Sequence, residues 1–173
     1  RRVLFRSLRE YLDEDASEEA IFLLDGLLRG APAASGFHYL AGLAHDADGD
    51  PEKAIAHFQK VDAASRFYQN AVIHIAFLYQ EEDRTEDAIA FLTRAAEQFP
   101  DNPDFLLHLG TFYEGLEQYE RAEEFLKKGL ALAPEDPRLH FRMGVVYDKW
   151  GRKQNSIDSM KTVIRLDPKH ANA

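Results

Sequence analysis

Cysteine is absent from this 173-residue sequence, and no run of apolar residues is long enough to span a lipid bilayer. The lack of cysteine excludes disulfides, thiolate metal sites and cysteine nucleophiles, but it does not separate a reducing compartment from an oxidising one. The sequence opens at Arg1 without a secretory signal pattern, and earlier removal of a leader stays open. We therefore expect a folded chain without membrane insertion, and its location in the cell stays open.

Motifs of common enzymes are also missing. The sequence has no His-Glu-x-x-His zinc motif, no glycine-rich phosphate loop and no serine nucleophile elbow. The acidic pairs Glu81 and Glu82, and Glu123 and Glu124, fall in expected turns or on exposed helical faces. We predict that the protein is not an enzyme and uses no cofactor.

The sequence does contain a 34-residue pattern that recurs five times without insertion or deletion. The windows are residues 1–34, which are divergent, 35–68, 69–102, 103–136 and 137–170. We expect residues 171–173 to be the start of a further, truncated repeat. The eighth position is small in the last four windows, where it holds Gly42, Ala76, Gly110 and Gly144. The 32nd position is proline in all windows but the second, and proline ends a helix. Residues 1–173 are therefore predicted to form a single repeat array.

Each window has helical apolar spacing twice, with an interruption near its fifteenth position. In the fourth window Phe105 and Phe112 share one side of the first helix, and residues 114–118 are the expected connection. In the second window Asp50 followed by Pro51 predicts an N-cap and the first residue of the second helix. Each window is therefore predicted to be a helical hairpin.

These columns resemble the tetratricopeptide repeat, a helix-turn-helix unit of 34 residues. Its signature includes a Leu-Gly pair followed three residues later by tyrosine, and Leu109, Gly110 and Tyr113 match it best. The resemblance implies an all-α, right-handed superhelical solenoid of tandem antiparallel helix hairpins that binds other proteins or peptides. The chaperone-binding subset clamps a terminal carboxylate with Lys and Asn at positions 5 and 9. No repeat here has that pair, so such a receptor is not expected.

The resemblance also implies where a partner would bind, because the first helices of such arrays line a concave surface. Positions 5 and 9 give this groove an apolar and aromatic floor, and position 6 adds histidine and arginine that would orient the partner. The predicted groove residues are Phe5, Tyr39, Leu43, Ile73, His74, Phe77, Leu107, His108, Thr111, Phe141, Arg142 and Val145. Such a surface suits an extended or helical peptide. The alternative is that several of these side chains pack against neighbouring helices, which would make the groove shallower.

The formal net charge of −9 is unevenly distributed. The third and fourth windows each carry −5, whereas the fifth carries +5 from eight basic and three acidic residues. The basic window could meet an acidic partner or the acidic middle of another copy, or it could be a solvated surface. Nucleic acid is a poor candidate because the chain is acidic, with a pI of about 5.2.

The last predicted helix suggests a second function. Ile157, Met160, Val163 and Ile164 are expected to be exposed on it, because terminal repeats of a solenoid need a polar cap. Either the sequence is a fragment of a longer array whose further repeats cover this face, or the face binds something, for example another copy in an end-to-end homo-oligomer. Self-assembly is therefore the alternative to binding in the groove.

Seven histidines raise the question of a metal site. His74 and His108 occupy one column of adjacent repeats, so a weak transition-metal contact is conceivable there. His38, His45 and His140 stand at packing positions, which favours partly buried, satisfied imidazoles. We therefore predict no metal site.

Overall fold

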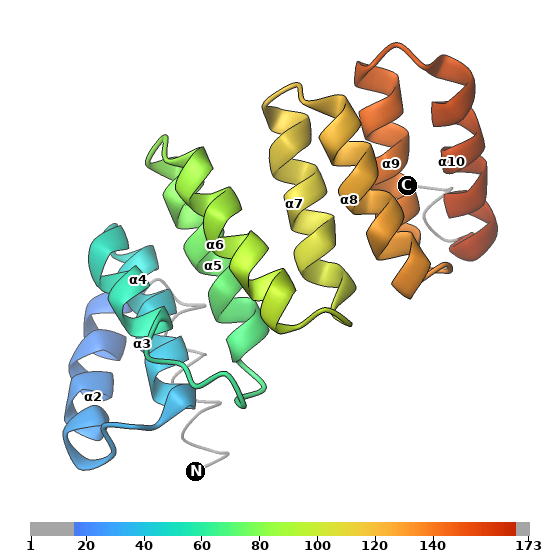
Figure 1. Ribbon diagram of the computed structural model, residues 1–173. Coiled ribbons are helices and arrows are strands. Elements are labelled where there is room, and N and C mark those ends of the chain that lie inside the picture. Colours follow the sequence, from blue (N-terminus) through green and yellow to red (C-terminus); the bar gives the residue numbers. More distant parts are fainter. Residues whose placement is uncertain (1–15, 169–173) are drawn as a thin grey trace. The chain divides into compact units, whose positions relative to one another are not determined.

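The computed structural model describes residues 16–168, which form α-helices joined by turns (Figure 1). The helices are α2 (Ser17–Gly30), α3 (Ser35–Ala47), α4 (Pro51–Phe58), α5 (Tyr68–Glu81), α6 (Thr85–Gln98), α7 (Pro103–Gly115), α8 (Tyr119–Leu132), α9 (Pro137–Lys149) and α10 (Lys153–Leu166). No strand occurs among the described residues. The all-α prediction is confirmed. Phe5 and residues 171–173, the predicted start of a further repeat, lie outside the described residues.

The turn between the two helices of a window has one backbone shape in four windows. Its fifteenth position is left-handed at Gly49, Asp83, Glu117 and Gly151, with φ between 58° and 77°. After α3, for example, Gly49 donates its N–H to the carbonyl of Asp46, and Asp50 donates to the carbonyl of His45 at 2.8 Å. These bonds satisfy carbonyls that the helix end would leave unpaired. The interruption in apolar spacing is therefore a helix end with a fixed geometry.

Three helices begin with the same local chemistry. Asp50, Asn102 and Asp136 each accept a hydrogen bond from a backbone N–H of the first turn, and a proline follows each of them. The acidic or amide side chain satisfies an N–H that has no partner inside the helix, and proline has none to satisfy. The predicted cap at Asp50 and start at Pro51 are confirmed.

The chain divides into two compact units, Arg1–Ala88 (unit 1) and Ile89–Ala173 (unit 2), and the boundary falls within α6. In unit 1, α3 packs against α2 and α4, and α4 packs against α5. In unit 2, α7 pairs with α8 and α9 pairs with α10, while α9 also packs against α7 and α8 (Figure 1). Each unit therefore has its own sets of packed hairpins.

Glycine at the eighth position lets the two helices of a hairpin approach closely. A Cβ on Gly42 would lie 2.5 Å from the ring of Phe58, and one on Gly144 would lie 2.7 Å from the terminal methyl of Met160. A larger residue would require the facing side chain or the helix itself to move, most of all at Gly42, where the rigid ring of Phe58 stands in the way. The small-residue column therefore sets the spacing inside each hairpin.

The same packing corrects the prediction for the last helix. Met160 is half-buried against α9 and Val163 is buried, so the expected exposed face of α10 is smaller than the sequence suggested. Ile157 and Ile164 remain 48% and 50% exposed. Separately, none of the helices in residues 16–168 is both long and apolar enough to cross a membrane.

Candidate partner-binding site

The predicted groove residues fall on the first helices of both units. In unit 1 they lie on α3 and α5, and in unit 2 on α7 and α9. The unit 1 set is Tyr39, Leu43, Ile73, His74 and Phe77, all of them half-buried. In unit 2, Leu107 is buried and Phe141 is 46% exposed. The remaining residues of this set are half-buried: His108, Thr111, Arg142 and Val145. Phe141 is thus the most open apolar side chain of the described set.

In unit 1, His74 lies within an aromatic cluster. Its ring stacks on Phe58 with centroids 5.1 Å apart, and its Nε2 lies 3.4 Å from the hydroxyl of Tyr39. Tyr39 also stacks on Phe67 at 5.2 Å. Burial lowers the pKa of His74, although Asp46 acts in the opposite direction. A neutral imidazole gives a partner a hydrogen-bonding group but no positive charge at neutral pH.

Leu43 shows that part of the predicted floor also serves the fold. Its side chain packs against the core of unit 1, which Leu24 of α2 and Leu40 and Ala44 of α3 help to form. The packing alternative therefore applies to at least one predicted groove residue in this unit.

In unit 2, α7, α9 and α10 enclose a pocket of about 320 Å³. Its lining is made of Leu107, Pro137, Arg138, Phe141, Arg142 and Val163. Three of these side chains are on the predicted list, so the structure brings Leu107, Phe141 and Arg142 together. Pro137, Arg138 and Val163 were not predicted.

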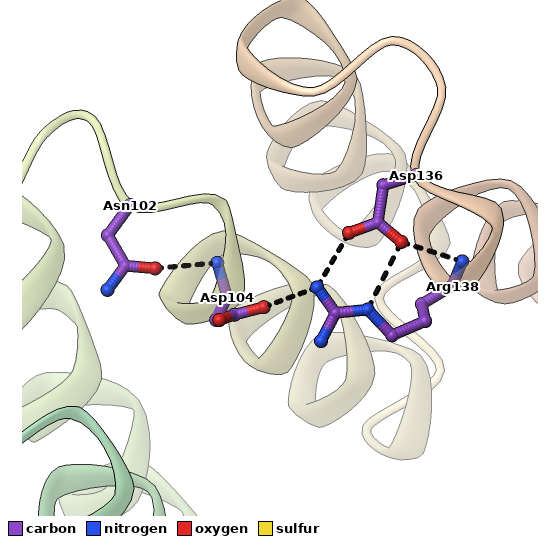
Figure 2. Close-up of polar contacts among 4 residues, drawn as sticks. All are labelled: Asn102, Asp104, Asp136 and Arg138. Atoms are coloured by element: carbon purple, nitrogen blue, oxygen red, sulfur yellow. Dashed lines mark hydrogen bonds and ion pairs between the residues drawn. The ribbon is translucent and has the colours of Figure 1, made fainter. Parts of the chain in front are cut away.

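Arg138 stands at the rim of this pocket and is held in place by two carboxylates (Figure 2). Its Nε and Nη2 donate to Asp136 at 3.1 and 2.6 Å, and Nη2 lies 2.7 Å from Oδ1 of Asp104. The side-chain hydrogen bond from Arg138 lowers the pKa of Asp136 below its ordinary value, against the effect of burial. Asn102 fixes the start of α7 by accepting the N–H of Asp104 at 3.0 Å. Arg138 therefore ties α9 to the first turn of α7.

A second ion pair ties the other ends of the same helices. Glu114 is only 5% exposed, accepts a hydrogen bond from Nζ of Lys149, and lies 3.5 Å from Nη1 of Arg142. The hydrogen bond to Glu114 raises the pKa of Lys149. The sequence prediction placed Glu114 in a connection, which is wrong, because α7 extends to Gly115 and buries the carboxylate. Opposite charges at positions 12 and 13 of adjacent windows were the signal for this pair.

His108 and Thr111 also lie on α7, where both are half-buried. Burial lowers the pKa of His108, with Arg142 acting in the same direction and Asp104 against it. The hydroxyl of Thr111 donates to the carbonyl of Leu107 at 3.0 Å. Within residues 16–168 no group of three His, Cys, Asp or Glu side chains has a geometry that could hold a metal ion. The unit 2 surface is thus an apolar pocket with an ordered, charged rim.

Comparisons with known proteins agree with this architecture. Models of the tetratricopeptide repeat match residues 7–68, 79–140 and 137–170. No curated protein sequence gives a significant match.

Several solved structures share the fold at low sequence identity. A crystal structure of MamA is 20% identical, covers 95% of this chain and 96% of its own, and has a TM-score of 0.72. MamA from Desulfovibrio magneticus RS-1, residues 41 to the end, is 23% identical over 95% and 94% of the two chains, with a TM-score of 0.71. YrrB, described as a TPR protein with an unusual peptide-binding site, is 16% identical over 95% and 84%, with a TM-score of 0.65. At these identities the likeness shows the fold alone. With the three family matches, it establishes that this chain belongs to the tetratricopeptide repeat family, whose members generally act as non-catalytic protein-interaction modules.

Proposed function

We propose that this protein binds a segment of a partner protein and that the unit 2 pocket receives an apolar side chain of that segment. The observation that carries the proposal is Phe141, which is 46% exposed beside the buried Leu107 in a pocket of about 320 Å³. That volume is at the small end of the roughly 300–1,000 Å³ range of ligand pockets. It suits a side chain better than a large cofactor.

The ion pairs around the pocket support this proposal because they hold its walls before a partner arrives. Arg138 joins α9 to Asp104 of α7, and Lys149 joins the far end of α9 to Glu114. Walls that are already ordered reduce the entropy that binding must remove. Arg138 and Arg142 also place N–H donors at the rim, where they can meet carbonyl or carboxylate oxygens of the partner.

The α3 and α5 surface of unit 1 is proposed as a further contact for the partner. Tyr39, Ile73 and Phe77 there are half-buried and keep part of their apolar surface open to solvent. Aromatic side chains are frequent in interfaces because they contribute a large apolar area, to which the hydroxyl of Tyr39 adds a polar group.

The test begins with a random-peptide library selected on the immobilised protein. The affinity of an enriched peptide is then measured by fluorescence anisotropy for the wild type and for Phe141→Ala. We expect the variant to bind about tenfold more weakly, or about 1.4 kcal/mol. Ile157→Ala removes an equally exposed apolar side chain from outside the pocket and should bind like the wild type. Equal affinities for wild type and Phe141→Ala would contradict the pocket assignment.

Self-assembly is the second proposed function, and the exposed face of α10 favours it. Ile157 and Ile164 are seven residues apart, so they lie on one side of the helix, and both are about half exposed. Light scattering after size exclusion would detect oligomers, and Ile157→Ser with Ile164→Ser should convert them to monomers. We expect little effect of salt, because cations of α9 already pair with carboxylates of α7 inside unit 2. A wild type that stays monomeric at high micromolar concentration would exclude this function.

A further inference from the structure

Three histidines meet on one side of the α3–α4 hairpin in unit 1. His38 and His45 are seven residues apart on α3, and His57 lies on α4. The Nδ1 atoms of His38 and His57 are 3.1 Å apart, and the rings of His45 and His57 stack with centroids 5.3 Å apart. We call these three residues the histidine cluster.

The hydrogen bonds fix which nitrogens carry protons when the cluster is neutral. Nε2 of His38 lies 2.8 Å from the carbonyl oxygen of Pro32, and a carbonyl can only accept, so this nitrogen carries a hydrogen. Nδ1 of a neutral His38 is then an acceptor, and Nδ1 of His57 must be the donor. The pair shares one proton across 3.1 Å, and a second proton there would place two N–H groups face to face.

The same three positions in the fourth window contain side chains that stay uncharged around neutral pH. They are Leu106, Tyr113 and Phe125, in place of His38, His45 and His57. Tyr113 and Phe125 stack with centroids 5.3 Å apart, the separation found for His45 and His57. The second window, residues 35–68, therefore has three histidine rings at positions where the fourth window has packing side chains that do not become charged.

Protonation of His57 is unfavourable in the folded hairpin. His38 and His45 are both buried, and Nδ1 of His45 has no hydrogen-bond partner among the described residues. Burial, followed by the nearby imidazoles of His38 and His45, lowers the pKa of His57 to about 4.

Charged groups on the neighbouring elements also affect the pKa of His57. Lys60, after α4, acts in the same direction, and Asp25 of α2 acts against it. Arg29 of α2 lines the same cavity as His38 and His57, and Asp50, which caps α4, interacts with His45. Basic and acidic neighbours therefore shift the pKa of His57 in opposite directions, and burial has the largest effect on it.

We propose that the histidine cluster is an acid-sensitive lock, in which the hydrogen bond between His38 and His57 joins α3 to α4 while His57 is neutral and is lost when His57 takes up a proton. Tyr39 and Leu43, two of the residues in the proposed binding surface, lie on α3. Opening of the hairpin would withdraw that part of the surface from a partner. The regulatory role therefore rests on the proposed function, whereas the lock itself does not.

The direction of the pH effect follows from proton binding. An unfolded His57 has a pKa near 6.5, above its value of about 4 in the hairpin, so the open form binds a proton more readily. The stabilisation of the closed hairpin by neutral His57 is complete above about pH 6.5 and is lost as the pH falls from there towards 4. The hairpin should therefore open between these values.

Hydrogen–deuterium exchange read by mass spectrometry can test the lock without any peptide ligand. After correction for the intrinsic pH dependence of exchange, we expect opening of residues 35–58 to increase roughly tenfold between pH 7 and pH 5. Residues 137–166 are an internal control. His140 there has the same bond to the carbonyl of Pro134, at 2.7 Å, but the other two positions hold Tyr147 and Ser159.

Transplanting the residues of the fourth window gives the decisive comparison. The triple variant His38→Leu, His45→Tyr, His57→Phe should fold and lose the pH dependence in residues 35–58. The reverse variant, Leu106→His with Tyr113→His and Phe125→His, should confer acid-dependent opening on residues 103–132. The proposal is overturned if wild-type opening is equal at pH 7 and pH 5, or if the triple variant keeps the dependence. Since no peptide is present, neither result bears on the unit 2 pocket.

Discussion

The side chain of Leu126 on α8 occupies the space into which a Cβ on Gly110 of α7 would project, with its Cγ only 2.6 Å from that position. Gly110→Ala would gain about 1 kcal/mol of helix propensity, but overpacking at a buried site costs about 1–3 kcal/mol. We expect a net loss of up to about 2 kcal/mol in the free energy of unfolding. Urea unfolding followed by the fluorescence of Trp150, the single tryptophan and a residue of the same unit, measures it.

Gly115 provides the matched control on the same helix. A Cβ there would have no neighbour within 4 Å, and its φ is not positive. Gly115→Ala should therefore leave stability unchanged or raise it slightly. A loss equal to that of Gly110→Ala would show that glycine is needed for a reason other than helix spacing.

The left-handed turn at Glu117 offers a stabilising substitution. Its φ is 58°, whereas the corresponding residues Gly49 and Gly151 adopt such angles without a Cβ. Glu117→Gly should relieve the backbone strain and raise the free energy of unfolding of unit 2 by about 0.5–1 kcal/mol. Thermal unfolding checks this, and Glu120→Gly, placed inside α8, should instead lower stability.

Glu114 is predicted to matter for stability despite its charge. Glu114→Gln removes the charge from a buried site at which Lys149 and Arg142 converge, and we expect a loss of about 1–3 kcal/mol. Glu124→Gln also breaks an ion pair, with Lys128 at 2.7 Å, but on the exposed surface of α8, and it should have no measurable effect. Similar behaviour of the two variants in urea unfolding would mean that burial of Glu114 is unimportant.

The hydroxyl of Tyr147 is predicted to lose its proton at a higher pH than that of an ordinary tyrosine. Burial, reinforced by the 2.6 Å hydrogen bond that its hydroxyl donates to Glu123, raises its pKa to about 12. Because the raised pKa favours the neutral form in the folded state, its stabilisation is present below about pH 10 and lost as the pH rises to about 12. Tyrosine Cζ chemical shifts recorded against pH would identify the shifted residue. In Glu123→Gln the pKa of Tyr147 should move towards 10, and an unchanged value would exclude Glu123 as a cause.

Much of the fold was predictable because the same local sequence signals recur in several windows. The turn at the fifteenth position and the cap at Asp50 follow from local chemistry that any hairpin of this length must satisfy. The misjudged residues are those whose exposure depends on a neighbouring helix. Met160 and Val163 were expected to be open, but α10 turns them towards α9. An apolar stripe shows which side of a helix is covered but not how far the cover extends.

The candidate site was predictable only in part for the same reason. The resemblance to the tetratricopeptide repeat implied which columns face a partner and so brought Leu107, Phe141 and Arg142 onto one list, and the structure places them around one pocket. The sequence prediction did not reveal that Glu114 is buried or that Arg138 is held by two carboxylates. Those features depend on side-chain length and on contacts between windows, which no single column contains.

The contacts between windows also have a consequence for synthesis on the ribosome. Tyr39 reaches His74, and Glu114 reaches Lys149, across only 35 positions of sequence, and the other contacts described here are at least as short. A chain with such local contacts need not wait for its distant end before it begins to pack, and it should fold quickly. Within each unit the helices can therefore begin to pack while later parts of the chain are still being translated, which shortens the time for which apolar surfaces of the nascent chain stay exposed.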